Sequence, residues 1–149
     1  MTKIRITKRF TFEMAHALLA YDGLCKNIHG HSYVLWVTIS GSPLNAEKNP
    51  KNGMLLDFTV LKTLINKHII DVFDHALLLN NKLPENLIQI LSENFEKVIP
   101  VNFQPTSENI LVEFADIINE ILPDNVKLFS LKLQETENSF TEWFAGDNN

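Results

Sequence analysis

Apolar and polar residues alternate along residues 3–16, which is the pattern of a strand with one buried face. The apolar positions share one parity, and they are Ile4, Ile6, Phe10, Phe12 and Met14. Residues 32–40 and 126–135 alternate in the same way, and residues 139–144 add a last short strand. The pattern therefore predicts four strands, two near each end of the chain.

Between the second and third strands, apolar residues recur at helical spacing and predict three helices. Asp57 is a suitable N-cap for the first helix, which we expect to reach about Val72. The second helix is predicted to start after Pro84, with an apolar stripe that extends to Val98. Thr106 is a suitable cap for the third helix. Paired strands separated by helices are typical of an α+β domain.

We therefore expect an antiparallel four-stranded sheet with helices on one face. The chain has 149 residues, which fits a single domain over residues 1–149.

Charge and cysteine content narrow the possible functions. Thirteen Lys and Arg against eighteen Asp and Glu give a net charge of −5, and no basic stripe suggests nucleic-acid binding. One cysteine allows no internal disulfide, which fits a reducing compartment. No apolar run approaches the ~18 residues of a membrane span, and no signal peptide is visible. We expect a cytoplasmic protein with neither a membrane nor a nucleic-acid partner.

Three histidines have the spacing of a metal site. His29 and His31 are two residues apart and point the same way on an extended backbone, and His16 shares the parity of the first strand's apolar face. If the two strands pair, all three imidazoles project from one face, as the ligands of catalytic zinc do. Cys25 is either a fourth ligand of a closed structural site or a free thiol activated by the nearby cation. The alternative is three ordinary histidines.

Two further segments carry candidate chemistry. In Asp74-His75, at a predicted helix end, the carboxylate can polarise the imidazole as a general base. The alternative is a helix C-cap, with His75 interacting favourably with the helix dipole. Glu135 shares the inward parity of its strand, and its carboxylate suits a guanidine-like edge. The alternative is a strand-end residue turned to solvent.

Six segments occur in one order along the chain: Phe12–His16, Cys25–Tyr33, Gly53–Phe58, Phe73–Leu77, Pro105–Asn109 and Glu135–Thr136. Together they resemble the 6-pyruvoyltetrahydropterin synthase / 6-carboxytetrahydropterin synthase family. The resemblance implies the tunnelling fold (T-fold). It also implies a homo-oligomer, a hexamer built as a dimer of trimers, with active sites between subunits. The stretch from Asn80 to Gln104 is longer than in compact bacterial members.

The resemblance also implies a role for each site residue. His16, His29 and His31 match the zinc ligands, with Zn2+ as cofactor, and Cys25 matches the proton acceptor. The remaining matches are the relay pair Asp74 and His75, the pterin-anchoring Glu135, and the pocket-lining Thr106 and Ser107.

The spacing Cys25-x3-His29-Gly30-His31 resembles the bacterial carboxy enzymes of queuosine biosynthesis more than the animal pyruvoyl enzymes. The implied reaction converts 7,8-dihydroneopterin triphosphate to 6-carboxy-5,6,7,8-tetrahydropterin, with release of acetaldehyde and triphosphate. One alternative is a 6-pyruvoyltetrahydropterin synthase. The other, from a different class, is a non-catalytic module with structural zinc.

Overall fold

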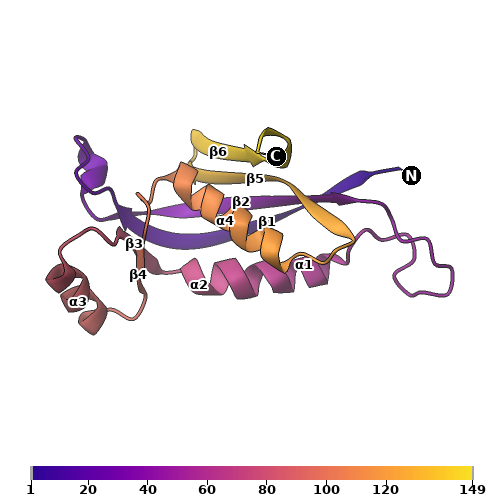
Figure 1. The fold of residues 1–149 in the computed structure, drawn as a ribbon, viewed down its shortest axis with the longest axis horizontal. Helices are drawn as coiled ribbons and strands as arrows, with labels where there is room; N and C mark the ends of the chain where they lie inside the picture. Colours follow the sequence, from indigo (N-terminus) through magenta and orange to yellow (C-terminus); the bar gives the residue numbers. More distant parts are fainter. Residues whose placement is uncertain (1, 149) are drawn as a thin grey trace.

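A long antiparallel hairpin forms the centre of the sheet in the computed structural model, which describes residues 2–148 (Figure 1). Its strands are β1 (Ile4–Ala17) and β2 (His29–Gly41), and β2 also pairs with β5 (Val126–Thr136). The antiparallel strand β6 (Ser139–Phe144) follows β5 at one edge. These are the four strands that the alternation predicts.

Two short strands extend the sheet on the other side of β1. They are β3 (Ala76–Asn80) and β4 (Val98–Val101), both paired in parallel, and the order is β4-β3-β1-β2-β5-β6. The expectation of four strands, all antiparallel, is therefore wrong. Nearly every residue of β3 is buried, so its sequence does not alternate.

The second predicted helix is shorter than expected. α3 (Glu85–Asn94) ends at the extended residue Phe95, and Val98 belongs to β4 instead of the helix stripe. Pro100 is compatible with β4 because an edge strand tolerates a residue without a backbone N–H. No residue of α3 is buried, and the helix lies beside β4 at the end of the sheet (Figure 1).

The other helices pack on one face of the sheet. α1 (Phe58–Ile65), a π-helical turn (Asn66–Ile70) and α2 (Asp71–Phe73) follow one another without a break, and Asp57 caps the start by accepting from Thr59 N–H. Every fourth residue of this rod joins the core: Leu61, Ile65, Ile69 and Phe73.

α4 (Ser107–Ile121) lies beside this rod, and Thr106 caps it as predicted (Figure 1). Ile110, Phe114 and Ile118 are the centre of its buried face. Within residues 2–148, the structure has no helix with the length and apolar character needed to cross a membrane.

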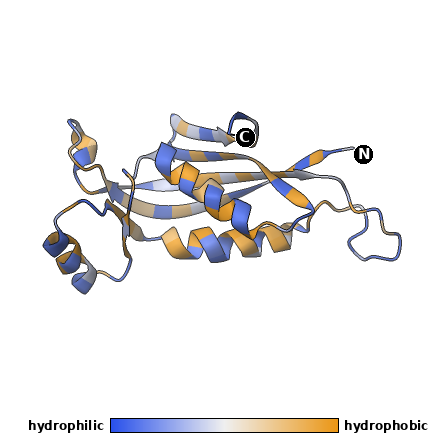
Figure 2. Ribbon diagram, in the orientation of Figure 1, coloured by the Kyte–Doolittle hydropathy of each residue, from blue (hydrophilic) through white to orange (hydrophobic). Residues whose placement is uncertain are grey.

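The alternation gives the hairpin two different faces, seen as orange and blue bands along the strands in Figure 2. The covered face, under α1 and α4, carries the buried residues Phe10, Phe12, Met14, Tyr33, Leu35, Val37 and Ile39. The open face carries the exposed residues of the other parity in β1, which are Arg5, Thr7, Arg9, Thr11 and Glu13.

Candidate active site

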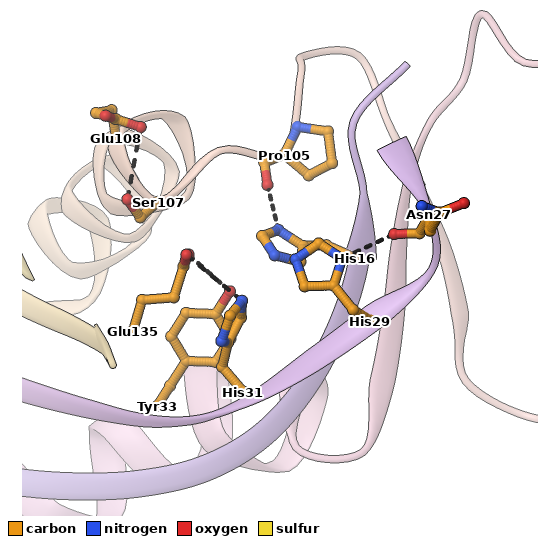
Figure 3. Close-up of polar contacts among 9 residues, drawn as sticks. All are labelled: His16, Asn27, His29, His31, Tyr33, Pro105, Ser107, Glu108 and Glu135. Atoms are coloured by element: carbon orange, nitrogen blue, oxygen red, sulfur yellow. Dashed lines mark hydrogen bonds and ion pairs between the residues drawn. The ribbon is translucent and has the colours of Figure 1, made fainter. Parts of the chain in front are cut away.

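Three histidines meet on the covered face, at the end of the hairpin where β1 finishes and β2 begins (Figure 3). The β1–β2 register pairs His16 with His29, and His31 follows two residues later on the same side. One ring nitrogen of each histidine lies within 4.8 Å of the other two. The convergence predicted from strand parity is therefore present in the structure.

Hydrogen bonds fix two of the imidazole rings. His16 Nδ1 lies 2.7 Å from the carbonyl oxygen of Pro105, and His29 Nδ1 lies 2.7 Å from that of Asn27. A carbonyl can only accept, so each Nδ1 is the donor in these bonds, and in the neutral ring the lone pair then lies on Nε2. Metal-binding histidines use such outer contacts to hold the ring in its ligating orientation.

The Nε2 atoms of all three histidines are buried, and none has a hydrogen-bond partner among residues 2–148. An unpaired buried polar atom is costly, and three that converge are what a bound cation would satisfy. Burial lowers the pKa of His31, and so do His16 and His29, although Glu135 opposes them. The neutral imidazole that metal binding requires is thereby favoured. The three histidines can hold a metal ion.

Glu135 reaches the same side of the site from the end of β5. Its Oε1 lies 3.4 Å from Nε2 of His31, and its Oε2 accepts a hydrogen bond of 3.2 Å from the hydroxyl of Tyr33. The contact with His31 is an ion-pair approach, since it does not meet hydrogen-bond geometry. Glu135 therefore points inward, as its parity predicts, instead of toward solvent.

Tyr33 is a site residue that the sequence reading does not single out. The β2–β5 register pairs Leu35 with Leu133, so two residues further along Tyr33 faces Glu135 across the strands. The side chain is fully buried, and burial, followed by the charge of Glu135, raises the pKa of Tyr33 far above its ordinary value. The phenol therefore remains a hydrogen-bond donor at every working pH.

Cys25 lies in a short 3-10 turn (Leu24–Lys26) of the loop between β1 and β2. It is half-buried, and its carbonyl accepts from Leu18 N–H at 2.9 Å. The metal-compatible cluster within residues 2–148 consists of the three histidines without Cys25. The charge of Cys25 nevertheless contributes to the raised pKa of Tyr33. The cluster thus offers three ligands without the thiol, as an open site requires, and Cys25 is free.

The Asp74–His75 pair forms as predicted. Asp74 Oδ2 lies 2.9 Å from His75 Nδ1, while Oδ1 accepts from the backbone N–H of Glu13 at 2.8 Å. The hydrogen bond from Glu13 is the main reason that the pKa of Asp74 is lowered, and His75 adds to it. Asp74 is also the C-cap of α2, so the cap and the pair coexist.

The backbone at His75 is unusual. Its φ is +62°, in the left-handed region that non-glycine residues seldom adopt. Lys97 Nζ donates to the carbonyls of Asp71 and Asp74 at 2.8 Å each, which holds the helix end just before this residue.

This pair does not share a face with the three histidines. The N–H of His75 donates to the carbonyl of Glu13 on β1, and its side chain is 75% exposed, whereas the next residue, Ala76, enters the core. On the open face, His75 lines a hollow of about 320 Å³ together with Glu13 and Ser32, and His31 also borders this hollow. Within residues 2–148, no hydrogen bond or ion pair joins the Asp74–His75 pair to the three histidines.

The first turn of α4 lies on the same side of the sheet as Glu135 and the histidines (Figure 3). Thr106 accepts from Asn109 N–H at 3.3 Å, and the hydroxyl of Ser107 lies 3.5 Å from the carboxylate of Glu108. Thr106 and Ser107 are thus near the predicted pocket, and Thr106 has a capping contact of its own.

Comparison with known proteins gives a consistent result. The sequence model described as 6-pyruvoyl tetrahydropterin synthase matches residues 5–145. A 6-carboxy-5,6,7,8-tetrahydropterin synthase from Haemophilus influenzae is 37% identical over 142 residues, which cover 93% of this chain and 97% of the relative. The enzyme of the same name from Rickettsia typhi is 37% identical over 144 residues, covering 93% and 99%.

Solved structures agree on the fold. An uncharacterized protein from Wolinella succinogenes superposes with a TM-score of 0.78 at 19% identity, over 97% of this chain and 99% of that one. The 6-pyruvoyl tetrahydropterin synthase of Caenorhabditis elegans gives 0.68 at 22% identity, over 97% of both. The expected T-fold is confirmed, and together with the sequence match this places the chain in the 6-pyruvoyl tetrahydropterin synthase family.

Proposed function

We propose that the chain is a 6-carboxy-5,6,7,8-tetrahydropterin synthase that acts on 7,8-dihydroneopterin triphosphate and releases acetaldehyde and triphosphate. The product would enter queuosine biosynthesis in the cytoplasm. The observation that carries the proposal is the set of three buried imidazole nitrogens, unpaired among residues 2–148, beside the inward carboxylate of Glu135. Relatives that bear this name match the chain over nearly its whole length.

We infer that the resident metal is zinc, held by His16, His29 and His31. Three neutral imidazoles with a free fourth position are the donor set of catalytic zinc. When bound, zinc supplies a Lewis acid that makes neighbouring C–H and O–H bonds of a substrate more acidic. The carbonyls of Pro105 and Asn27 would keep two of the rings in their ligating tautomer.

The other side chains of the site would bind and orient the pterin. Glu135 would offer its carboxylate to the guanidine-like edge of the pterin ring. The hydroxyl of Tyr33 donates to Oε2 of Glu135 and so holds this carboxylate in place. Thr106 and Ser107, in the first turn of α4, would line the ring pocket. Cys25, as thiolate, would accept a proton from the substrate side chain, because a nearby cation favours the charged form of a thiol.

We further propose that His75, oriented by Asp74, relays protons at the site of another copy of the chain. The support is geometric, because the pair lies on the open face and the histidine cluster on the covered face. A homo-oligomer with sites between subunits, arranged as a hexamer of two trimers, would bring the two together. The triphosphate-bearing substrate would then bind between copies.

Shared sites can be tested by coexpressing two inactive variants, Cys25→Ala and His75→Ala. Random assortment leaves roughly a quarter of sites with both wild-type residues, so we expect that fraction of activity to return. Each variant expressed alone is the control. No recovery in mixed oligomers would contradict the relay between copies.

The proposed reaction is tested by loading the protein with zinc, adding 7,8-dihydroneopterin triphosphate and identifying products by mass. We expect 6-carboxy-5,6,7,8-tetrahydropterin with one acetaldehyde per turnover. A 6-pyruvoyl product without acetaldehyde would assign the other activity of the family. Absence of turnover, combined with unfolding on chelation, would point to a structural zinc module.

A further inference from the structure

Gln104 joins two parts of the site that are far apart in sequence. Its side-chain amide pairs with both backbone groups of Leu19, since Leu19 N–H donates to Oε1 at 3.0 Å and Nε2 donates to the carbonyl of Leu19 at 2.8 Å. An amide has one donor group and one acceptor, so it matches a backbone N–H and C=O at once. Two bonds fix both the distance and the direction of the contact.

The contact between Gln104 and Leu19 is linked by one further hydrogen bond to the loop that carries Cys25. Leu18, next to the residue that Gln104 holds, donates its N–H to the carbonyl of Cys25 at 2.9 Å. The loop that carries Cys25 is therefore tied back to its own first residues, and those residues are tied to Gln104. Asn80 Nδ2 also approaches Gln104 Oε1, at 3.4 Å.

Gln104 is also linked through its backbone neighbours to the histidine cluster and to the start of α4. The residue after Gln104 is Pro105, whose carbonyl accepts from His16 Nδ1. The carbonyl of Gln104 itself accepts from Thr106 N–H at 2.7 Å and from Asn109 Nδ2 at 2.9 Å. The backbone at Gln104 is thus fixed to the start of α4 without help from its side chain.

We propose that Gln104 is a positioning residue that sets the place of the Cys25 thiol relative to the histidine cluster. The catalytic meaning of this role rests on the proposed function, while the mechanical coupling does not. Because the backbone is anchored independently, loss of the amide frees the loop and leaves the Pro105–His16 contact in place. The side chain therefore controls the thiol, and metal binding is independent of it.

The test compares the variant Gln104→Ala with the wild type in the zinc-loaded enzyme. We expect zinc content to stay at the wild-type level, kcat to fall by ~10–100-fold through misplacement of the reacting group, and KM to stay within about twofold because the ring contacts are untouched. Alkylation of Cys25 by iodoacetamide should accelerate by about tenfold, as expected for a loop that loses two hydrogen bonds.

Gln104→Glu tests whether the two hydrogen bonds to Leu19 matter, or only the volume of the side chain, because glutamate has nearly the same size as glutamine. The carboxylate can still accept from Leu19 N–H but faces the Leu19 carbonyl with a second acceptor, so we expect the same accelerated alkylation. Gln89→Ala removes an amide on exposed α3 that, within residues 2–148, bonds only to Glu93, and this variant should match the wild type in every measurement.

Wild-type kcat and alkylation rates in both Gln104 variants would overturn the proposal, as would loss of zinc together with a normal alkylation rate. The alkylation readout needs no substrate. If the wild type lacks synthase activity, the proposed function fails, and the coupling between Gln104 and Cys25 is still decided.

Discussion

The two faces of the central hairpin carry clusters of opposite character. On the covered face, His16, His29 and His31 lie close together, and their Nε2 atoms are buried and unpaired within residues 2–148. On the open face, Asp74 and His75 are already paired with each other, and the His75 side chain is 75% exposed.

The two faces differ in what a single chain provides. The covered face brings together everything needed to bind a cation, because both strands of one hairpin supply the ligands. The open face presents the Asp74–His75 pair to solvent, and no metal-compatible cluster of residues 2–148 includes either residue. Under the proposed relay between copies, metal binding should be a property of the single chain, and turnover should require more than one copy.

Removal of one histidine ligand from the covered face should have the largest effect. We expect His29→Ala to reduce metal content, measured by atomic emission, from one ion per chain to background, because two imidazoles cannot complete the site. His68→Ala, which removes a histidine from the π-helical turn, is the matched control and should keep its metal. Unchanged metal content in His29→Ala would refute the ligand set.

A second test separates metal binding from turnover. Cys25→Ala should retain its metal yet lose turnover by ~10²–10⁴-fold, the usual contribution of a positioned proton acceptor. Metal analysis and product formation are measured on the same preparation. If the metal disappears with the thiol, Cys25 is a ligand and the covered face holds a closed site.

A smaller effect is expected at Tyr33, whose hydroxyl donates a hydrogen bond to the carboxylate of Glu135. Tyr33→Phe keeps the buried ring and removes a hydrogen bond to a charged group, so we expect KM for the pterin substrate to rise by about tenfold. Metal content and kcat should change little. An unchanged KM would show that Glu135 needs no support from the phenol.

The smallest expected effect is a pH-dependent loss of thermal stability on removal of the Asp74 carboxylate from the open face. The lowered pKa of Asp74 means that its ionised form stabilises the fold. That stabilisation is present above the unfolded pKa of about 3.9 and disappears as pH falls through the lower folded value. Asp74→Asn should therefore melt about 1–3 °C below the wild type at pH 7, with a smaller gap in acid. A gap that widens in acid would contradict this sign.

The histidine cluster was predictable because strand parity puts the three side chains on one face, and pairing of the two consecutive strands brings them to the same end of the hairpin. Residues of one parity in a hairpin share a face, so His16, His29 and His31 converge once β1 and β2 pair. The caps Asp57 and Thr106 were predictable for a similar reason, since capping is local in sequence.

The position of His75 and the contacts of Tyr33 and Gln104 could not be predicted, because they depend on tertiary contacts that no local sequence pattern encodes. β3 is short and almost wholly buried, so the alternation that would have shown the side on which His75 lies is missing. The Tyr33–Glu135 contact depends on the register between β2 and β5, which shifts at an irregularity beside Thr38. The contact between Gln104 and Leu19 spans 85 positions and appears only once the chain is folded.

The π-helical turn between α1 and α2 has a consequence for how the Asp74–His75 pair is aimed. Buried residues every four positions, from Leu61 to Phe73, would drift by about 40° per step around a regular α-helix. A wider turn cancels part of that drift and keeps the rod in phase with the sheet. Deleting one residue within Asn66–Ile70 would rotate everything after it by about 100°. The orientation of the Asp74–His75 pair therefore depends on the length of a single helical turn that precedes it in the chain.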